Sequence, residues 1–165
     1  MDFQLGDPVI HWTYGLGKVV RIEERKFSGE KTLYYVVQIR DLTVWVPADA
    51  QLMSRLRSPT TKRGFSKLFT ILSEPGESLS DDRLERKTQL VEVLKGGRAE
   101  SVCRVIRDLS FYQHRKPLNE NDKLVLKQAL DLLLSEWGFS LSVPLAQAQV
   151  ELNGLLMKAP QQVTA

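Results

Sequence analysis

Hydrophobic and polar residues alternate along the first third of the chain. Within residues 31–40, apolar side chains recur at every second position, which is the period of a β-strand with one buried face. These side chains are Leu33, Tyr35, Val37 and Ile39. Residues 17–27 alternate as well, with Val20 and Ile22 on the side predicted to be buried. The pattern therefore predicts two neighbouring strands.

Turn residues separate these strands from each other and from shorter ones. Ser28-Gly29-Glu30 predicts a hairpin turn, and Asp41 predicts a turn into a strand at 42–46. The glycines of Tyr14-Gly-Leu-Gly17 lack the third glycine and the βαβ context of a nucleotide-binding loop, so we interpret them as a turn between strands. Short strands joined by glycine turns predict a small β-barrel over residues 1–57.

From about residue 58 the apolar spacing changes to the period of an α-helix. The predicted boundaries are Ser58-Pro59 opening the first helix, Ser80 and Gly96-Gly97 around the second, Lys116-Pro117 after the third, Asn119 and Gly138 around the fourth, and Ser142 with Pro144 opening the fifth. The expected buried stripes are Phe65, Leu68, Phe69 and Leu72; Leu90, Val91 and Leu94; Val102, Val105, Ile106 and Leu109; Leu126, Leu130, Leu133, Leu134 and Trp137; and Leu145, Ala148, Leu152 and Leu155.

The two patterns together predict an α+β protein in which a β-barrel precedes an all-α domain of about five helices. The barrel domain is expected at 1–57 and the helical domain at 58–158. The tail at 159–165 has no apolar stripe and is expected to be frayed.

Composition describes an ordinary globular protein with a mild basic bias. The 165 residues are 42% hydrophobic and 26% charged, with a formal net charge of +3. No apolar run approaches the length that crosses a bilayer, and the acidic, polar N-terminus is not that of a signal peptide, so cytoplasm is expected and no membrane partner. The single Cys103 sits at a helical apolar position, which predicts a buried thiol and fits a reducing compartment.

Enzymatic chemistry finds little support in the sequence. The only two histidines, His11 and His114, fall in different predicted domains, and no H-E-x-x-H or C-x-x-C spacing is present. Asp81-Asp82 is explained by a favourable interaction with a helix N-terminus. We therefore expect no metal, no cofactor and no catalysis. A hypothesis from a different class of function is that the protein is a small hydrolase with a site between the domains.

Motifs in both halves resemble the CarD family of bacterial transcription regulators over roughly residues 2–137. In the barrel these are Phe3-x-Leu-Gly-Asp-x-Val-Ile, Tyr14-Gly-Leu-Gly-Lys-Val, Ile22-Glu-x-Arg25, Gly29-Glu and Val44-x-Val-Pro47. In the helical half they are Val102-x-x-Val-Ile-Arg-Asp-Leu109, Leu118, Lys123 and Leu126-x-x-Ala129. Their order and spacing across two domains make the combination specific.

The resemblance implies a Tudor/SH3-like barrel that binds the RNA polymerase β subunit. It also implies a helical domain that contacts promoter DNA at the upstream edge of the transcription bubble, where the family inserts a tryptophan wedge into the minor groove. This chain has Asp82 where the wedge is expected, counting back from Lys87, and no aromatic residue lies between Phe69 and Phe111. We therefore do not expect this chain to insert a wedge into DNA.

Basic residues near that position are the candidates for contact with phosphates. Arg83, Arg86 and Lys87 could position DNA without specifying its sequence. A solvated helix face, with Glu85 interspersed, explains the same residues equally well. The spacing of Arg83 and Lys87 puts two cations on one face, which costs helix stability and is mild evidence for an anionic partner.

Strand phase selects the candidate contacts on the barrel. Arg25 and Phe27 lie opposite in phase to the strand's apolar positions, and Trp45 is opposite to Val44 and Val46. An outward Trp beside Arg and Phe is typical of a protein-binding hot spot. The competing interpretation is that Trp45 packs against the helical domain. The barrel also has a strand edge that could pair with a partner, although the pattern does not identify which strand it is.

Two hypotheses on transcription follow. The leading one is a non-enzymatic regulator that binds the RNA polymerase β subunit and modulates the stability of the promoter open complex. The alternative is a polymerase-binding adaptor whose helical domain binds a protein and not DNA, which the missing wedge and the modest charge favour.

Overall fold

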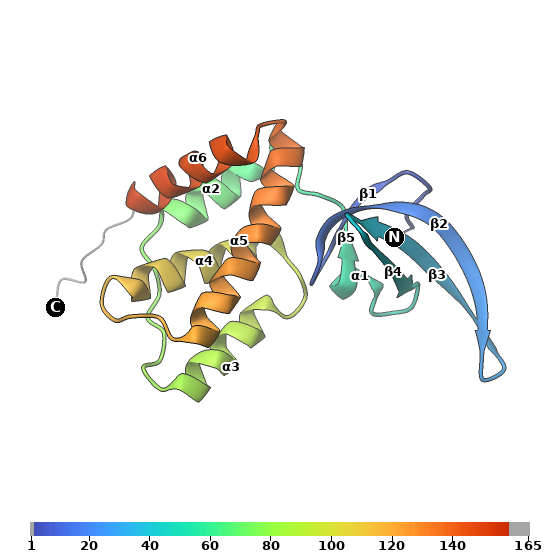
Figure 1. Cartoon of the computed structure of the whole chain (residues 1–165), viewed down its shortest axis with the longest axis horizontal. Coiled ribbons are helices and arrows are strands. Elements are labelled where there is room, and N and C mark those ends of the chain that lie inside the picture. Colours follow the sequence, from blue (N-terminus) through green and yellow to red (C-terminus); the bar gives the residue numbers. More distant parts are fainter. Residues whose placement is uncertain (1, 159–165) are drawn as a thin grey trace. The chain divides into compact units, whose positions relative to one another are not determined.

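The computed structural model describes residues 2–158, with the exception of the side chain of Phe27. The chain divides into two compact units, residues 1–59 and the remainder from Thr60 onward (Figure 1). The tail predicted to be frayed, 159–165, lies outside the described residues. The α+β class is confirmed, with a Tudor-like sheet unit followed by a helical unit.

The first unit is a five-stranded antiparallel sheet in the order β4-β3-β2-β1-β5. Its elements are β1 (Pro8–His11), β2 (Gly15–Phe27), β3 (Glu30–Ile39), β4 (Leu42–Pro47), a short helix α1 (Leu52–Arg55) and β5 (Leu56–Arg57). Its buried core contains Phe3, Val9, Val19, Tyr35, Val37, Ile39, Val46, Leu52 and Leu56. The alternation predicted for β3 is therefore confirmed at Tyr35, Val37 and Ile39, whereas Leu33 is exposed.

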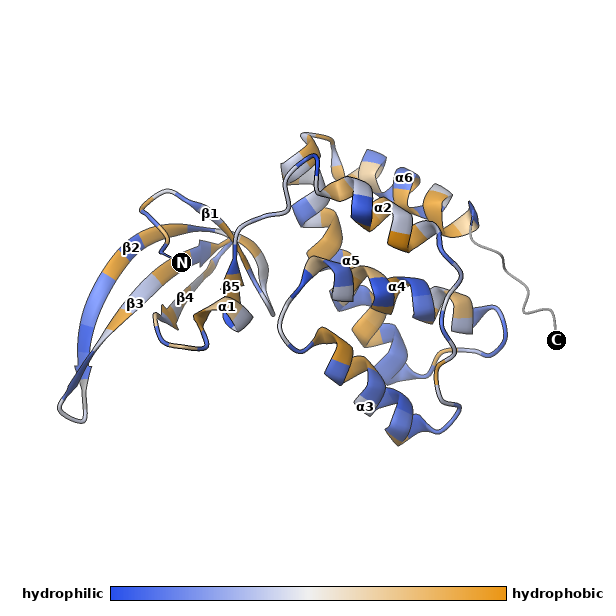
Figure 2. Ribbon diagram, turned by 180° about the vertical axis from the view of Figure 1, so that it is seen from behind, coloured by the Kyte–Doolittle hydropathy of each residue, from blue (hydrophilic) through white to orange (hydrophobic). Residues whose placement is uncertain are grey.

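The predicted hairpin turn is present between β2 and β3. Phe27 pairs with Glu30, and the two intervening residues, Ser28 and Gly29, have positive φ values of 51° and 85°. Two successive positive φ values match the right-handed twist of the flanking strands. Figure 2 shows this hairpin extending as a long curved ribbon whose tip is largely hydrophilic.

The prediction that Val20 and Ile22 are buried in β2 is wrong. Both side chains are 40% exposed. The register shifts between Val19 and Arg21, so Val20 is the additional residue of a β-bulge while Val19 fills the core. Ile22 pairs with the core residue Tyr35 and is exposed nevertheless.

The segment Tyr14-Gly-Leu-Gly17 connects strands, as predicted. β1 ends at His11 and β2 begins at Gly15, whose φ is 89°. A Cβ atom on Gly17 would lie 2.5 Å from Ile39 Cγ1 and 2.8 Å from the carbonyl oxygen of Gln38. Glycine is required at position 17 because the backbone of β3 approaches too closely for a side chain.

The second unit has five described helices: α2 (Phe65–Ser73), α3 (Arg83–Leu94), α4 (Ala99–Gln113), α5 (Glu120–Leu141) and α6 (Leu145–Lys158). The helix α4 contacts α2, α3 and α5, and α2 also packs against α6 (Figure 1). The predicted stripe of α4 is buried at Val102, Val105, Ile106 and Leu109, and Cys103 is buried beside it. Trp137 is fully buried against Phe65 and Phe69, as predicted.

Several predicted helix boundaries are wrong for local reasons. α2 begins at Phe65 and not at Ser58-Pro59, because Arg57 still belongs to β5 and the chain turns first at Thr61, whose hydroxyl accepts the Gly64 N–H. Ser80 is not the N-cap of α3; Asp82 is, and it accepts the N–H groups of Leu84 and Glu85.

The last two helices also differ from expectation, α5 in where it ends and α6 in which residues it buries. Asn119 caps α5 through a reciprocal capping box with Asp122, as predicted. Gly138 does not end that helix, which continues to Leu141 and terminates at Ser142 with a φ of 54°. A single glycine costs a helix interior only about 1 kcal/mol, less than tertiary packing supplies. Leu145, predicted to be buried in α6, is exposed.

Candidate functional site

Two candidate residues of the barrel unit, Arg25 and Trp45, share one face of the sheet. In the strand register Arg21 pairs with Val36, and Val36 pairs with Trp45, so their side chains project to the same side. Glu23 and Arg25 follow on that side of β2, because alternate residues of a strand share a face. The register therefore brings Trp45 of β4 beside the charged residues of β2, although 22 positions separate Glu23 from Trp45 in the sequence.

On this face, the carboxylate of Glu23 accepts hydrogen bonds from three side chains. Its Oε1 accepts the Nε–H of Arg21 at 2.9 Å, and its Oε2 accepts the Nε–H of Arg25 at 3.1 Å. The indole Nε1–H of Trp45 donates to the same Oε2 at 3.1 Å. The hydrogen bond from Trp45, followed by that from Arg21, holds the pKa of the Glu23 carboxyl below its ordinary value.

Arg25 and Trp45 also contact each other directly. The guanidinium carbon of Arg25 lies 5.3 Å from the centroid of the Trp45 ring, a cation–π geometry, and 38% of Trp45 is exposed. We call Arg21, Glu23, Arg25 and Trp45 the Glu23 cluster. Phe27, the third predicted contact, contributes its backbone to the last pair of β2 with β3, and its side chain lies outside the part of the structure that is described.

The described strands show which strands form the edges of the sheet, a point that the sequence pattern did not decide. β4 and β5 are the terminal strands of the sheet, and β4 pairs on only one side, with β3. An edge strand presents unpaired N–H and C=O groups to a partner strand. Trp45 lies in the middle of β4, so the edge and the Glu23 cluster are adjacent.

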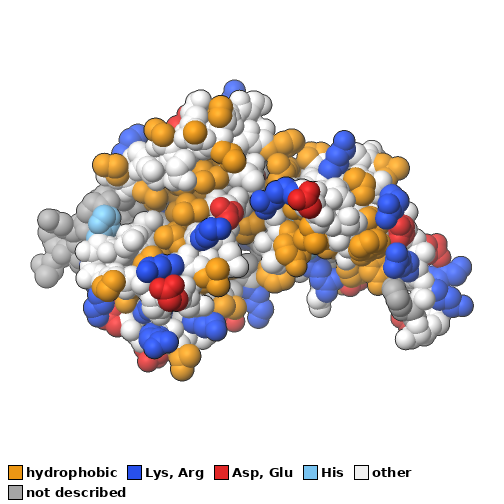
Figure 3. Space-filling view, viewed as in Figure 1, with side chains coloured by type: hydrophobic (Ala, Val, Ile, Leu, Met, Phe, Trp, Pro, Cys, Tyr) orange, Lys and Arg blue, Asp and Glu red, His pale blue; other side chains and the backbone are white. Residues whose placement is uncertain are grey.

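The candidate DNA contacts lie at the start of α3. Arg83 and Lys87 are exposed and lie one turn apart, so they project from the same side of the helix. Asp82, at the position where the resemblance led us to expect the wedge, is the N-cap of this helix. On the face drawn in Figure 3, Lys and Arg side chains are interspersed with Asp and Glu and with apolar groups.

Arg86 is not available for contact with phosphate, which corrects the sequence prediction. Its side chain is 4% exposed and makes a bidentate ion pair with Asp122, with Nε and Nη2 lying 3.0 Å and 2.9 Å from the two carboxylate oxygens. Its Nη1 donates to the Ser80 carbonyl at 2.9 Å and to the Tyr112 hydroxyl at 3.2 Å. Arg86 therefore joins the starts of α3 and α5, and its role is internal.

Sequence reasoning missed the exposed apolar residues of α3. Leu84 is 76% exposed in the first turn, between Arg83 and Lys87 in the sequence, and Val91, predicted to be buried, is exposed as well. The helix buries little apart from Leu90 and Arg86. Arg86 fills one of these buried positions, whereas the sequence had placed it among the candidate contacts with phosphates.

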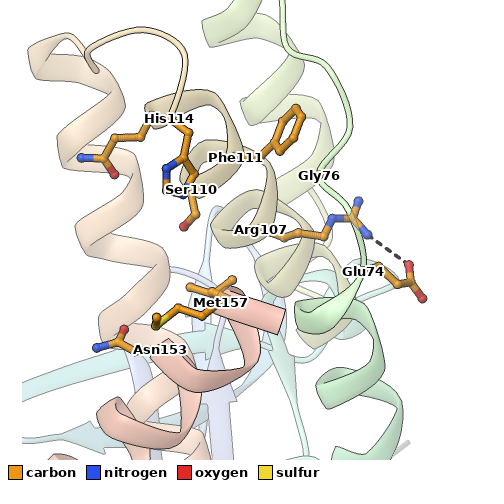
Figure 4. A pocket seen from close by; sticks show the side chains of 10 residues that line it. Glu74, Gly76, Arg107, Ser110, Phe111, His114, Asn153 and Met157 are labelled. Carbon is orange, nitrogen blue, oxygen red and sulfur yellow. Dashed lines mark hydrogen bonds and ion pairs between the residues drawn. The ribbon is translucent and has the colours of Figure 1, made fainter. Parts of the chain in front are cut away.

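The helical unit also contains a pocket of about 490 Å³ between α4, the end of α6 and the loop that follows α2 (Figure 4). Buried Arg107 contributes to its wall and donates from Nε to Asp108 at 2.9 Å and from Nη1 to Glu74 at 3.3 Å. The Glu77 N–H donates to Asp108, whose pKa is raised by burial. These contacts of Arg107 and Asp108 link the loop to α4.

Two further observations concern metal binding and membrane-spanning helices among the described residues. No group of three or more His, Cys, Asp or Glu side chains among residues 2–158 could hold a metal ion. None of the described helices has the length and apolar character needed to cross a bilayer.

Comparison with known proteins assigns both units to one family. The CarD-like/TRCF RID domain matches residues 3–57, and the CarD C-terminal domain matches residues 67–153. The chain belongs to the CarD-like family. A protein of Bacillus subtilis (strain 168) named "Putative transcription factor YdeB" is 33% identical over 140 residues, which cover 81% of this chain and 89% of that protein. This CarD-like protein is thus a transcription regulator that interacts with RNA polymerase, and its family indicates a transcription factor and not an enzyme.

Proposed function

We propose that the barrel unit binds the β subunit of RNA polymerase through Arg25, Phe27 and Trp45. The observation that carries this proposal is the Glu23 cluster, in which Trp45 and Arg25 stack beside each other at the surface of the sheet. Trp and Arg are enriched among residues that dominate binding energy. The adjacent edge of β4 supports the same surface, because a strand of the β subunit can pair with it.

The helical unit then contacts promoter DNA near the upstream edge of the transcription bubble and modulates the stability of the open complex. Arg83 and Lys87 are the phosphate contacts in this proposal, since Arg86 is buried. Leu84 supplies an exposed apolar side chain beside them, and apolar side chains inserted at base steps stabilise distorted DNA. The net charge of +3 gives only weak affinity for free DNA, so the polymerase-bound barrel has to bring this helix to the promoter.

A second candidate function is a polymerase-binding adaptor whose helical unit binds a protein. The exposed apolar residues of α3, Leu84 and Val91, together with the interspersed charges of Figure 3, favour this alternative. DNA contact predicts that replacing Arg83 and Lys87 by Ala lowers the salt dependence of polymerase–promoter affinity by about two counterions. The adaptor predicts an unchanged salt dependence for the same variant.

Co-elution with the isolated N-terminal lobes of the β subunit tests the barrel assignment. The wild-type chain is expected to co-elute, and the combined variant Arg25→Glu and Trp45→Ala is expected not to. Lys26→Glu with Trp12→Ala is the matched control, because it changes the same charge and another exposed tryptophan outside the cluster. Equal binding by the cluster variant and the control would show that the barrel surface is assigned wrongly.

A further inference from the structure

We propose that Glu23 is the positioning residue of the polymerase-binding surface: its carboxylate holds Arg21, Arg25 and Trp45 in the orientation that the partner recognises. This inference rests on the proposed function, because it concerns the same face of the barrel. It adds that an acidic residue at the centre of a basic surface increases affinity for the partner.

The geometry gives Glu23 this role through hydrogen bonds to three side chains. One carboxylate accepts the Trp45 Nε1–H and the Nε–H groups of Arg21 and Arg25, all within 3.1 Å. Both arginines donate through Nε, and no hydrogen bond from their terminal Nη groups is found among the described residues. The Nη groups, which form the fork that binds a carboxylate in a bidentate manner, therefore remain for a partner.

Without Glu23 these three side chains would sample many rotamers at the surface. Arg21 and Arg25 are 56% and 47% exposed, so packing alone does not fix them. Binding to a partner would then have to immobilise each side chain, which opposes association. Glu23 performs that ordering in the free protein, which is preorganisation of the binding surface.

A mechanism based on net charge and one based on positioning predict opposite changes in affinity for the partner when Glu23 is removed. Removing a carboxylate makes the surface more positive, so a surface that works by net charge alone would bind an acidic partner more tightly. A surface that needs its side chains held in place would bind more weakly. The direction of the change therefore distinguishes the two mechanisms.

The experiment measures the affinity of the full-length chain for core RNA polymerase. Glu23→Ala is expected to weaken binding by about tenfold, a factor that corresponds to 1.4 kcal/mol. Glu23→Gln changes the charge equally but keeps a carbonyl acceptor for the Trp45 indole, so it is expected to retain part of the affinity. Glu24→Ala is the control, since Glu24 is exposed on the same strand and its one ion pair among the described residues is with Lys31, at 3.6 Å.

A double-mutant cycle measures the coupling between Glu23 and Trp45, which a purely structural role of Glu23 would not produce. If Glu23 acts through Trp45, Glu23→Ala is expected to cost clearly less in a Trp45→Ala background than in the wild type. The indole Nε1–H resonance of Trp45 is also expected to shift as the Glu23 carboxyl titrates, at a pH below that of an ordinary glutamate. The resonance is assigned by its disappearance in Trp45→Phe.

Each outcome separates this inference from the proposed function. If the wild-type chain does not bind polymerase while Trp45 still reports the titration of Glu23, the proposed function fails and the positioning role has no partner to act on. If the wild type binds and Glu23→Ala binds equally or more tightly, the positioning role is refuted and the barrel assignment stands. Additive effects in the double-mutant cycle would refute positioning through Trp45 as well.

Discussion

Removal of the Arg86 guanidinium is expected to destabilise the helical unit severely. Arg86 and Asp122 are 4% and 1% exposed at their side chains and share two hydrogen bonds of 3.0 Å and 2.9 Å. In Arg86→Met the carboxylate of Asp122 stays buried, and among the described residues the Asn119 N–H, at 3.0 Å, is the donor from a neighbouring residue that remains to it. Leaving one member of a buried ion pair without its partner costs about 3–5 kcal/mol. That is a large fraction of the roughly 5–15 kcal/mol that stabilises a typical domain.

Urea unfolding followed by Trp137 fluorescence measures this loss. Trp137 is fully buried in the helical unit, and replacing Trp12 and Trp45 by Phe makes it the sole tryptophan. With a slope of about 2 kcal/mol per molar urea, the expected change lowers the unfolding midpoint by about 2 M.

Arg83→Met, three residues earlier on the same helix, is the control for that measurement. Arg83 is exposed, so its replacement is expected to change stability by less than about 0.5 kcal/mol. Combining Arg86→Met with Asp122→Asn is expected to cost less than the sum of the single variants, because the buried charge is removed together with its partner. Equal midpoints for Arg86→Met and Arg83→Met would refute the reasoning that Arg86 is an internal structural residue.

Two further predictions concern the backbone and pH. Gly76→Ala is expected to cost about 1–3 kcal/mol in the same assay, because its Cβ would lie 2.3 Å from Phe111 Cβ, whereas Gly154→Ala, in open space on α6, is expected to stabilise by about 0.4–1 kcal/mol. Burial lowers the pKa of His11 below its ordinary 6.5, and its neutral Nδ1 accepts the N–H groups of Thr13 and Tyr14. The neutral form is therefore favoured by folding, so this stabilisation is complete above pH 6.5 and is lost as the pH falls through the lower folded-state pKa. His11→Asn keeps an acceptor but cannot titrate, and the acid-induced fall in the barrel's melting temperature is expected to be smaller in this variant; an identical fall would contradict the assignment to His11.

Local sequence signals predicted the local features of this fold. Ser28-Gly29 specifies a two-residue turn through positive φ values, and Asn119 caps a helix with a residue three positions away. Both depend only on neighbours in the chain, so a single sequence contains the necessary information. The stripe of α4 was equally accessible, since the helical period alone places it on one face.

Features that depend on distant partners were not predictable in the same way. Arg86 is buried because Asp122, 36 residues away, neutralises it, and nothing near Arg86 in the sequence signals that pairing. Trp45 was correctly placed outward, but its hydrogen bond to Glu23 required the register of β2, β3 and β4. The bulge at Val20 shifted the phase of β2 within a strand whose alternation looked continuous.

A promoter footprint tests the central claim that this CarD-like protein brings its helical unit to DNA through polymerase. We expect additional protection at the upstream edge of the bubble only when polymerase is present, lost in Arg25→Glu with Trp45→Ala and weakened in Arg83→Glu with Lys87→Glu. The same protection without polymerase, or an unchanged footprint with polymerase and the wild-type protein bound, would contradict the account.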